Sequence, residues 1–167
     1  MTAKVLLTLW RHGEAGSAAS DAARELTDRG RVEVNAMASD FSAWLDAAGL
    51  PSVAGLYCSP LIRAQQTAAL LGQQGCAKPP EVCPALVPGA IPAGFAESLL
   101  DDDAHVVAVT HQPFLSRAIA FWSDDGTLAP LAPAGYATLQ VTSLERGGAT
   151  VLRHRPDPRQ AGQMRSS

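Results

Sequence analysis

The chain of 167 residues, 47% of them hydrophobic, is long enough for one domain with its own core, and this composition excludes general disorder. Its formal net charge of -3 gives no general attraction to nucleic acid or to an anionic membrane, so an anion site would have to be a local cluster. The sequence shows no signal peptide and no apolar run of the roughly 20 residues that a membrane span needs. Its cysteines, Cys58, Cys76 and Cys83, lack metal-ligand or redox-pair spacing. We therefore expect a soluble cytoplasmic protein that binds neither nucleic acid nor membrane.

The first part of the sequence predicts two strands with a long helix between them. Residues 5–10 form an apolar run that is too short for an ordinary helix and apolar on both faces, as in a central strand. Thr27 is a candidate N-cap, and the apolar residues after it keep helical spacing to Ala48, before Gly49. Residues 54–58 read as a second short strand. This order is typical of a strand, helix, strand unit with parallel strands.

A second helix is predicted after residue 58, with Ser59 as its N-cap and Pro60 at its first position. Arg63 then lies in the first turn, near the free N–H groups that make helix N-termini anion sites. The remaining predicted elements are an edge strand at residues 81–83, a helix through Phe95, Leu99 and Leu100, a strand at residues 104–110, a helix from Pro113 to Trp122, and a hairpin of residues 137–141 and 150–154.

The alternation of strands and helices predicts an α/β fold. We expect a three-layer α/β/α sandwich with a mostly parallel central sheet, formed by one domain over residues 1–155. Residues 156–167 are rich in proline and polar side chains and are expected to form a flexible tail.

Charged groups follow three of the predicted strands directly. Arg11 and His12 follow the first strand, Arg63 lies just after the second, and His111 follows the strand at residues 104–110. Open α/β sheets bind ligands at the carboxyl ends of their strands, so these groups are expected to converge. Two histidines and two arginines suit a phosphoryl group, because phosphoryl transfer needs a nucleophile and positive charge around the phosphoryl oxygens.

The chemistry of each side chain suggests its role. A neutral imidazole can attack phosphorus at neutral pH, so we interpret His12 as a nucleophile that becomes phosphorylated. Arginine carries a permanent charge in a planar fork that matches phosphate oxygens, so Arg11, Arg63 and Arg24 would hold the group. Protonated His111 would donate to a transferring oxygen. Neighbouring arginines should depress the pKa of His12 and keep it neutral.

Four segments together resemble, in order, the motifs of the histidine phosphatase superfamily. The small size is most similar to the SixA-type phosphohistidine phosphatases, and the resemblance covers roughly residues 5–122. The segments are Leu9-Trp10-Arg11-His12-Gly13-Glu14-Ala15, Leu26-Thr27-Asp28-Arg29-Gly30, Ser59-Pro60-Leu61-Ile62-Arg63-Ala64-Gln65-Gln66-Thr67-Ala68 and Thr110-His111-Gln112-Pro113.

The resemblance implies a phosphoglycerate mutase-like fold and a specific set of site residues. It makes His12 the phosphorylated nucleophile and places Arg11, Arg63 and His111 in the phosphate pocket. In the SixA type an arginine just before the Leu-Thr-x-x-Gly segment also reaches the phosphate, and it corresponds to Arg24.

The sequence departs from the larger members of this family, which carry an acidic general acid after the second helix. The nearest matching stretch, residues 83–88, contains no acidic residue. Glu81 and Glu97 lie nearby without a motif to place them, and Glu14 fits either an orienting role or a structural salt bridge. SixA-type members are understood to work without a dedicated acid.

We therefore predict a phosphatase that uses a phosphohistidine intermediate and no cofactor or metal, with a protein phosphohistidine as the favoured substrate. The segment from Gly72 to Asp103 is all that could cap the site, and a shallow pocket admits a side chain of another protein. The alternatives are a small-molecule phosphatase or mutase of the same superfamily, and a non-catalytic module that binds phosphate. His105 and His154 are interpreted as partly exposed residues without a catalytic role.

Overall fold

The computed structural model describes residues 5–74, 79–90 and 105–163, and its centre is a six-stranded sheet with the strand order β3-β2-β4-β1-β5-β6. The order confirms the α/β class. The strands are β1 (Val5–Arg11), β2 (Gly55–Cys58), β3 (Glu81–Val82), β4 (His105–Thr110), β5 (Tyr136–Val141) and β6 (Ala149–Arg155).

Parallel pairing dominates the sheet, as predicted. Strand β4 pairs in parallel with both β1 and β2, and β2 pairs in parallel with β3. The predicted hairpin, β5 and β6, joins antiparallel at the other edge. In the β1–β4 register Arg11 lies opposite Thr110. The residues that follow, His12 and His111, therefore leave the sheet side by side.

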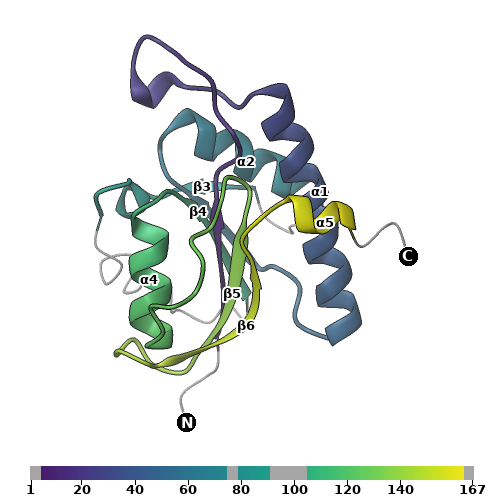
Figure 1. Cartoon of the computed structure of the whole chain (residues 1–167), viewed down its shortest axis with the longest axis vertical. Coiled ribbons are helices and arrows are strands. Elements are labelled where there is room, and N and C mark those ends of the chain that lie inside the picture. The colour runs from purple at the N-terminus through teal and green to yellow at the C-terminus, as the bar shows by residue number, and fades with distance from the viewer. Residues whose placement is uncertain (1–4, 75–78, 91–104, 164–167) are drawn as a thin grey trace.

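Helices cover both faces of the sheet, which confirms the three layers (Figure 1). The α helices are α1 (Asp28–Ala48), α2 (Ile62–Gln73), α4 (Phe114–Ser123) and α5 (Arg159–Gln163), and the short 3-10 helices are η1 (Asp21–Ala23) and η2 (Pro84–Leu86). One core cluster joins Trp122 of α4 to the sheet, and a second joins Trp10 of β1 to Met37 of α1. Within the described residues, no helix is long and apolar enough to cross a membrane.

The predicted signals at the two ends of α1 are confirmed. Thr27 Oγ1 accepts the backbone N–H of Gly30 at 3.0 Å, and Gly49 closes the helix with φ of 65°. Gly30 has a second role, because a Cβ there would fall on the carbonyl of Glu14. The absence of a side chain lets the first turn of α1 rest against the chain that leaves β1.

Three predictions about local structure are wrong. Ser59 does not cap α2, because the helix begins at Ile62 with Leu61 as its N-cap residue; the Ser59 hydroxyl accepts the backbone N–H of Leu61 and contacts His111. Pro113 precedes α4 as its N-cap residue. Residues 156–167 were expected to form a flexible tail, but Arg159–Gln163 forms α5, and Ala161 is buried in the same core cluster as residues of α1. The predicted helix through Phe95, Leu99 and Leu100 lies outside the described residues.

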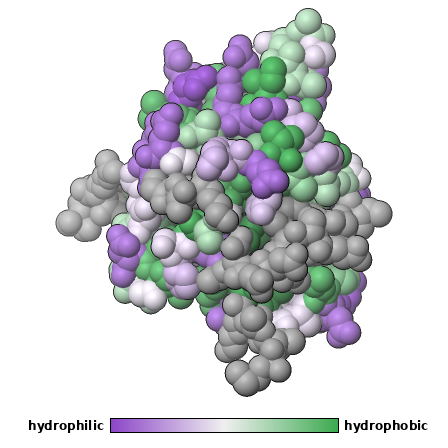
Figure 2. Space-filling view, turned by 180° about the vertical axis from the view of Figure 1, so that it is seen from behind, coloured by the Kyte–Doolittle hydropathy of each residue, from purple (hydrophilic) through white to green (hydrophobic). Residues whose placement is uncertain are grey.

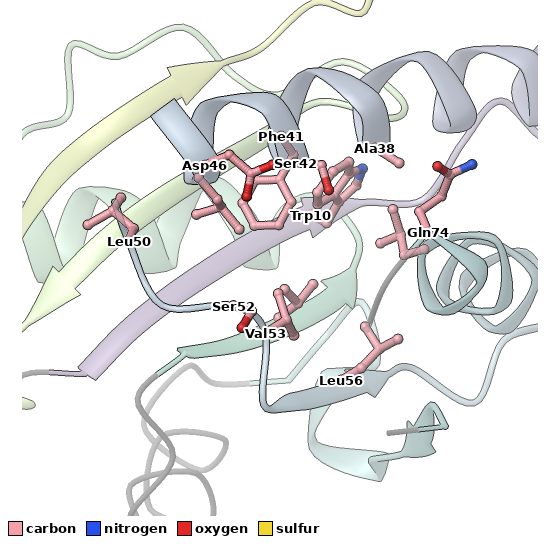
Figure 3. Close-up of a pocket in the computed structure, with 13 residues that line it drawn as sticks. Trp10, Ala38, Phe41, Ser42, Asp46, Leu50, Ser52, Val53, Leu56 and Gln74 are labelled. Atoms are coloured by element: carbon pink, nitrogen blue, oxygen red, sulfur yellow. The ribbon is translucent and has the colours of Figure 1, made fainter. Parts of the chain in front are cut away.

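A cavity of about 250 Å³ opens on the α1 and α2 side of the sheet. Trp10 and Phe41 lie together beneath α1 in this cavity, with Leu56 and Val53 opposite them (Figure 3). None of the predicted site residues lines it. The cavity is therefore separate from the strand ends where the charged groups gather.

Candidate active site

The structure brings the two predicted histidines together at the ends of neighbouring parallel strands. The ring centroids of His12 and His111 lie 5.0 Å apart, and the ring planes are tilted by 52°. Both residues are buried. A phosphoryl group bound at one ring would therefore lie within reach of the other.

The hydrogen bonds of His12 identify its reactive nitrogen. Nδ1 lies 2.7 Å from the carbonyl oxygen of Gly13, and because a carbonyl only accepts, Nδ1 carries the proton. The lone pair is then on Nε2, which lies 3.4 Å from Nε of Arg63. Burial lowers the pKa of His12 to about 4, with a further contribution from the charge of Arg63. His12 is therefore a neutral imidazole at neutral pH, and its unprotonated Nε2 accepts a hydrogen bond from Arg63.

The turn after His12 is held by Thr67, which the sequence analysis did not include in the site. The backbone N–H of Gly13 donates to Thr67 Oγ1 at 3.0 Å, and that hydroxyl donates to the carbonyl of Arg63 at 2.8 Å. A Cβ on Gly13 would meet a methyl group of Val34 at 2.8 Å, so a glycine is needed here. One threonine thus fixes His12 relative to Arg63.

Arg63 is buried, and its guanidinium group uses two different edges. The Nη edge binds Asp21, because Nη1 donates to the Asp21 carbonyl at 2.7 Å and Nη2 to Oδ2 at 3.1 Å. The Nε edge faces His12. Arg63 therefore keeps its Nε donor directed at His12 while Asp21 fixes the plane of the guanidinium group. Sequence reasoning missed Asp21, because its spacing to Arg24 indicates an ion pair with Arg24 but not the contact with Arg63, 42 residues away.

Arg24 lies in the loop that carries η1 and reaches the site through Asp21. Its Nε donates to the carbonyl of Gly16 at 2.8 Å, and its Nη1 donates to Asp21 Oδ1 at 3.2 Å. The structure shows no direct contact between Arg24 and His12, but the charge of Arg24 contributes to the lowered pKa of His12. Its role as a phosphate ligand stays a prediction.

Arg11 is anchored by one nitrogen and leaves another available. Nη1 donates to the carbonyl of Leu131 at 2.9 Å. Nε is buried and has no hydrogen-bond partner among the described residues. A buried donor without an acceptor is costly, so this atom is suited to a bound anion.

Ser59 determines which nitrogen of His111 carries the proton. Its Oγ accepts the backbone N–H of Leu61 at 3.2 Å and lies 2.7 Å from Nε2 of His111. Ser59 is fully buried, so its hydroxyl proton needs an acceptor, and Nε2 is the acceptor within reach. The proton of His111 must then be on Nδ1, which is buried and has no hydrogen-bond partner within the described part of the chain.

His111 was predicted to be protonated when it acts on the phosphoryl group, whereas the fold by itself lowers its pKa. Burial lowers its pKa to about 3, and the neighbouring His12 and Arg63 contribute in the same direction. The cause is that the fold buries the ring and surrounds it with arginines. His111 nevertheless remains a donor, because the neutral ring presents Nδ1–H.

The acidic residues weighed as general acids lie in other roles. Glu14 Oε1 accepts the hydroxyl of Thr27 at 2.9 Å, next to the α1 cap, and Glu81 is exposed on the edge strand. Glu97 lies outside the described residues. The carboxylate that binds the site arginines is that of Asp21. Hydrogen bonds from Arg24 and Arg63 lower its pKa.

The two other histidines do not join the site. His105 was expected to be partly exposed but is fully buried, because Thr8 and the carbonyl of Pro51 bind its two ring nitrogens at 2.8 and 2.9 Å. His154 contacts the carbonyl of Ala129. In the described ranges there is no group of three or more His, Cys, Asp or Glu side chains that could hold a metal ion.

Comparison with known proteins shows the family of this chain. The family model of the histidine phosphatase superfamily (branch 1) matches residues 7–87. An uncharacterized protein of Picosynechococcus is 33% identical over 158 residues, which cover 89% of each chain. The chain therefore belongs to the histidine phosphatase superfamily.

Solved structures show the same fold. The protein histidine phosphatase SixA, in complex with tungstate, is 25% identical and has a TM-score of 0.77 over 93% of this chain and 99% of its own. A structure described as a putative SixA phosphohistidine phosphatase, from Nakamurella, is 26% identical with a TM-score of 0.71, covering 92% and 98%. A phosphoserine phosphatase from Entamoeba histolytica shares the fold at 16% identity and a TM-score of 0.63, covering 90% and 96%.

Proposed function

We propose that this protein is a phosphatase that removes the phosphoryl group from a phosphohistidine side chain of another protein, through an intermediate phosphorylated on His12. The observation that carries the proposal is the lone pair on His12 Nε2, which faces Arg63 Nε at 3.4 Å. A module that only binds phosphate would need the arginines but no nucleophile held in this state.

The first half of the reaction transfers the phosphoryl group to His12. Arg63, Arg11 and the Nδ1–H of His111 would hold its oxygens. His12 Nε2 forms a bond to phosphorus while the bond from phosphorus to the substrate ring nitrogen breaks, and that nitrogen takes the electron pair. If the other ring nitrogen of the substrate carries a proton, the ring leaves as neutral imidazole. No further proton is then required from the protein.

The second half returns the protein to its starting state. A water molecule attacks the phosphorus on His12, the bond to Nε2 breaks, and the electron pair returns to that nitrogen. Inorganic phosphate leaves and the water proton passes to phosphate or solvent. The same donors serve both halves, because the phosphoryl group occupies the same place in each.

The carboxylates at the site favour this substrate over an alkyl phosphate. An alkoxide leaving group needs a proton in the transition state. Glu14 is bound near the α1 cap, and two arginines hold Asp21 in its ionised form. Since neither is suited to donate that proton, a substrate whose leaving group brings its own proton fits best.

The test compares kcat/KM for phosphoimidazole, 4-nitrophenyl phosphate and a sugar phosphate, with the His12→Ala protein as the blank. We expect phosphoimidazole to be the best substrate and the sugar phosphate the poorest. A sugar phosphate that equals or exceeds phosphoimidazole would show a small-molecule phosphatase instead. A phosphorylated protein partner and a cytoplasmic setting remain part of the proposal.

A further inference from the structure

The Asp21 side chain combines two bonds to arginines with a large exposed surface. Its Oδ1 accepts from Arg24 at 3.2 Å and its Oδ2 from Arg63 at 3.1 Å, so one carboxylate connects two of the predicted phosphate-binding residues. Even so, 65% of the side chain is exposed. A carboxylate offers about four acceptor positions, and these two contacts use one on each oxygen. Asp21 can therefore accept another hydrogen bond from outside.

The position of Asp21 relative to the nucleophile follows from the two edges of Arg63. The Nε edge faces His12, where the phosphoryl group is expected, and the Nη edge binds Asp21. The guanidinium group of Arg63 thus separates the carboxylate from the expected position of the phosphoryl group. An imidazole ring is about as wide as a guanidinium group, so it can span the same distance. A ring whose phosphorylated nitrogen lies at His12 can turn its other nitrogen toward Asp21.

The loop around Asp21 leaves room for such a ring. It projects from the top of the molecule (Figure 1), and Figure 2 shows the same projection in the pale green of small apolar side chains. Its neighbours are small residues: Ala18, Ala19, Ser20, Ala22 and Ala23. A substrate ring presented by another protein can approach the carboxylate without displacing a large side chain.

We infer that Asp21 is a specificity-determining residue that accepts the distal ring N–H of a phosphohistidine substrate. This inference rests on the proposed function and specifies how the substrate class is selected. The N–H bond stays intact and leaves with the ring, so Asp21 remains ionised throughout. Its negative charge favours a leaving group that starts with a positive charge and disfavours one that departs as an anion.

The experiment measures the Asp21→Asn protein on two substrates. Asparagine keeps the shape of the side chain but removes its charge. We expect kcat/KM for phosphoimidazole to fall by about 10-fold or more, the size of a lost charge-assisted hydrogen bond. Activity on 4-nitrophenyl phosphate should fall less, because it loses only the support that Asp21 gives to Arg24 and Arg63, so the ratio of the two kcat/KM values should change by about 10-fold or more. Asp124→Asn, a change at the far end of α4, is the control and should alter neither value.

The outcomes separate the inference from the proposed function. An equal loss on both substrates would show that Asp21 only orients its arginines, and no loss on either would show that it does not contact the substrate. Both results overturn the inference while leaving the proposed function intact. If the unchanged protein prefers the sugar phosphate to phosphoimidazole, the proposed function itself fails. Thermal unfolding of each variant checks that the fold is retained.

Discussion

Replacing Ser59 by alanine removes the hydroxyl that fixes the tautomer of His111. In the structure this hydroxyl lies 2.7 Å from Nε2, and its burial leads us to infer that it donates to Nε2, which places the ring proton on Nδ1. Without it, Nε2 becomes a buried acceptor without a partner, at a cost of about 1–3 kcal/mol. Nothing then holds the proton on Nδ1, and a ring protonated on Nε2 presents a lone pair to the phosphoryl oxygens. One preorganised donor is lost, and kcat should fall by about 100-fold or more.

Two measurements check this prediction. Nitrogen chemical shifts of His111 distinguish a ring protonated on Nδ1 from one protonated on Nε2, and we expect Nδ1–H in the original protein at neutral pH. Steady-state kinetics of Ser59→Ala should then show the loss in kcat with little change in KM. Ser116→Ala, an exposed serine on α4, is the matched control. An Nε2–H ring in the original protein, or unchanged kcat in Ser59→Ala, would refute the reasoning.

The other predictions concern pH, the turn after the nucleophile, and stability. The pKa of His12 is lowered to about 4, so protonation of this residue should not lower kcat/KM for 4-nitrophenyl phosphate between pH 8 and 5. We expect kcat/KM to fall as the pH drops through about 4, and a fall centred near pH 6.5 would contradict this. Thr67→Val removes the bonds to Gly13 and Arg63 and should lower kcat about 10-fold, whereas full activity would show that Thr67 does not support the turn. Asp40 is buried between Tyr136, Arg153 and Arg155, so Asp40→Asn should lower the free energy of unfolding in urea by about 3 kcal/mol; a loss below about 1 kcal/mol would contradict it.

Stability should also depend on pH through the buried histidines. The pKa values of His12, His105 and His111 are all lowered, mainly by burial, so the unfolded chain binds more protons than the folded one below its ordinary histidine pKa of about 6.5. The contribution of these histidines to the free energy of unfolding is therefore fully present above that pH. It is lost as the pH falls toward about 4. Urea unfolding at a series of pH values measures this, and a constant midpoint between pH 6.5 and 4.5 would contradict it.

Much of the fold could be predicted because local signals and tertiary packing agree. The apolar run of β1 and the cap of α1 at Thr27 are both visible in the sequence and both present in the structure. Ser59 shows where this fails. Its position before Pro60 is typical of a helix cap, but the hydroxyl is used by His111, which lies 52 residues away in the chain. Local propensity cannot show such a contact.

The candidate site was predicted in outline for a similar reason. His12, Arg63 and His111 follow strands, and parallel strands end at one edge, so their convergence could be expected. The contact of Asp21 with Arg63 and the protonation state of His111 could not be predicted from the sequence. Both depend on how the η1 loop folds back and on how deeply the rings are buried, which no spacing in the sequence records.

The central claim is that His12 carries the phosphoryl group during turnover, and trapping the intermediate tests it most directly. The reaction with phosphoimidazole is quenched during steady state, the protein is digested under alkaline conditions, and mass spectrometry locates the modified peptide. We predict one phosphoryl group on His12, absent from the His12→Ala protein, which should also be inactive. A phosphoryl group on another residue, or full activity in His12→Ala, would contradict the account.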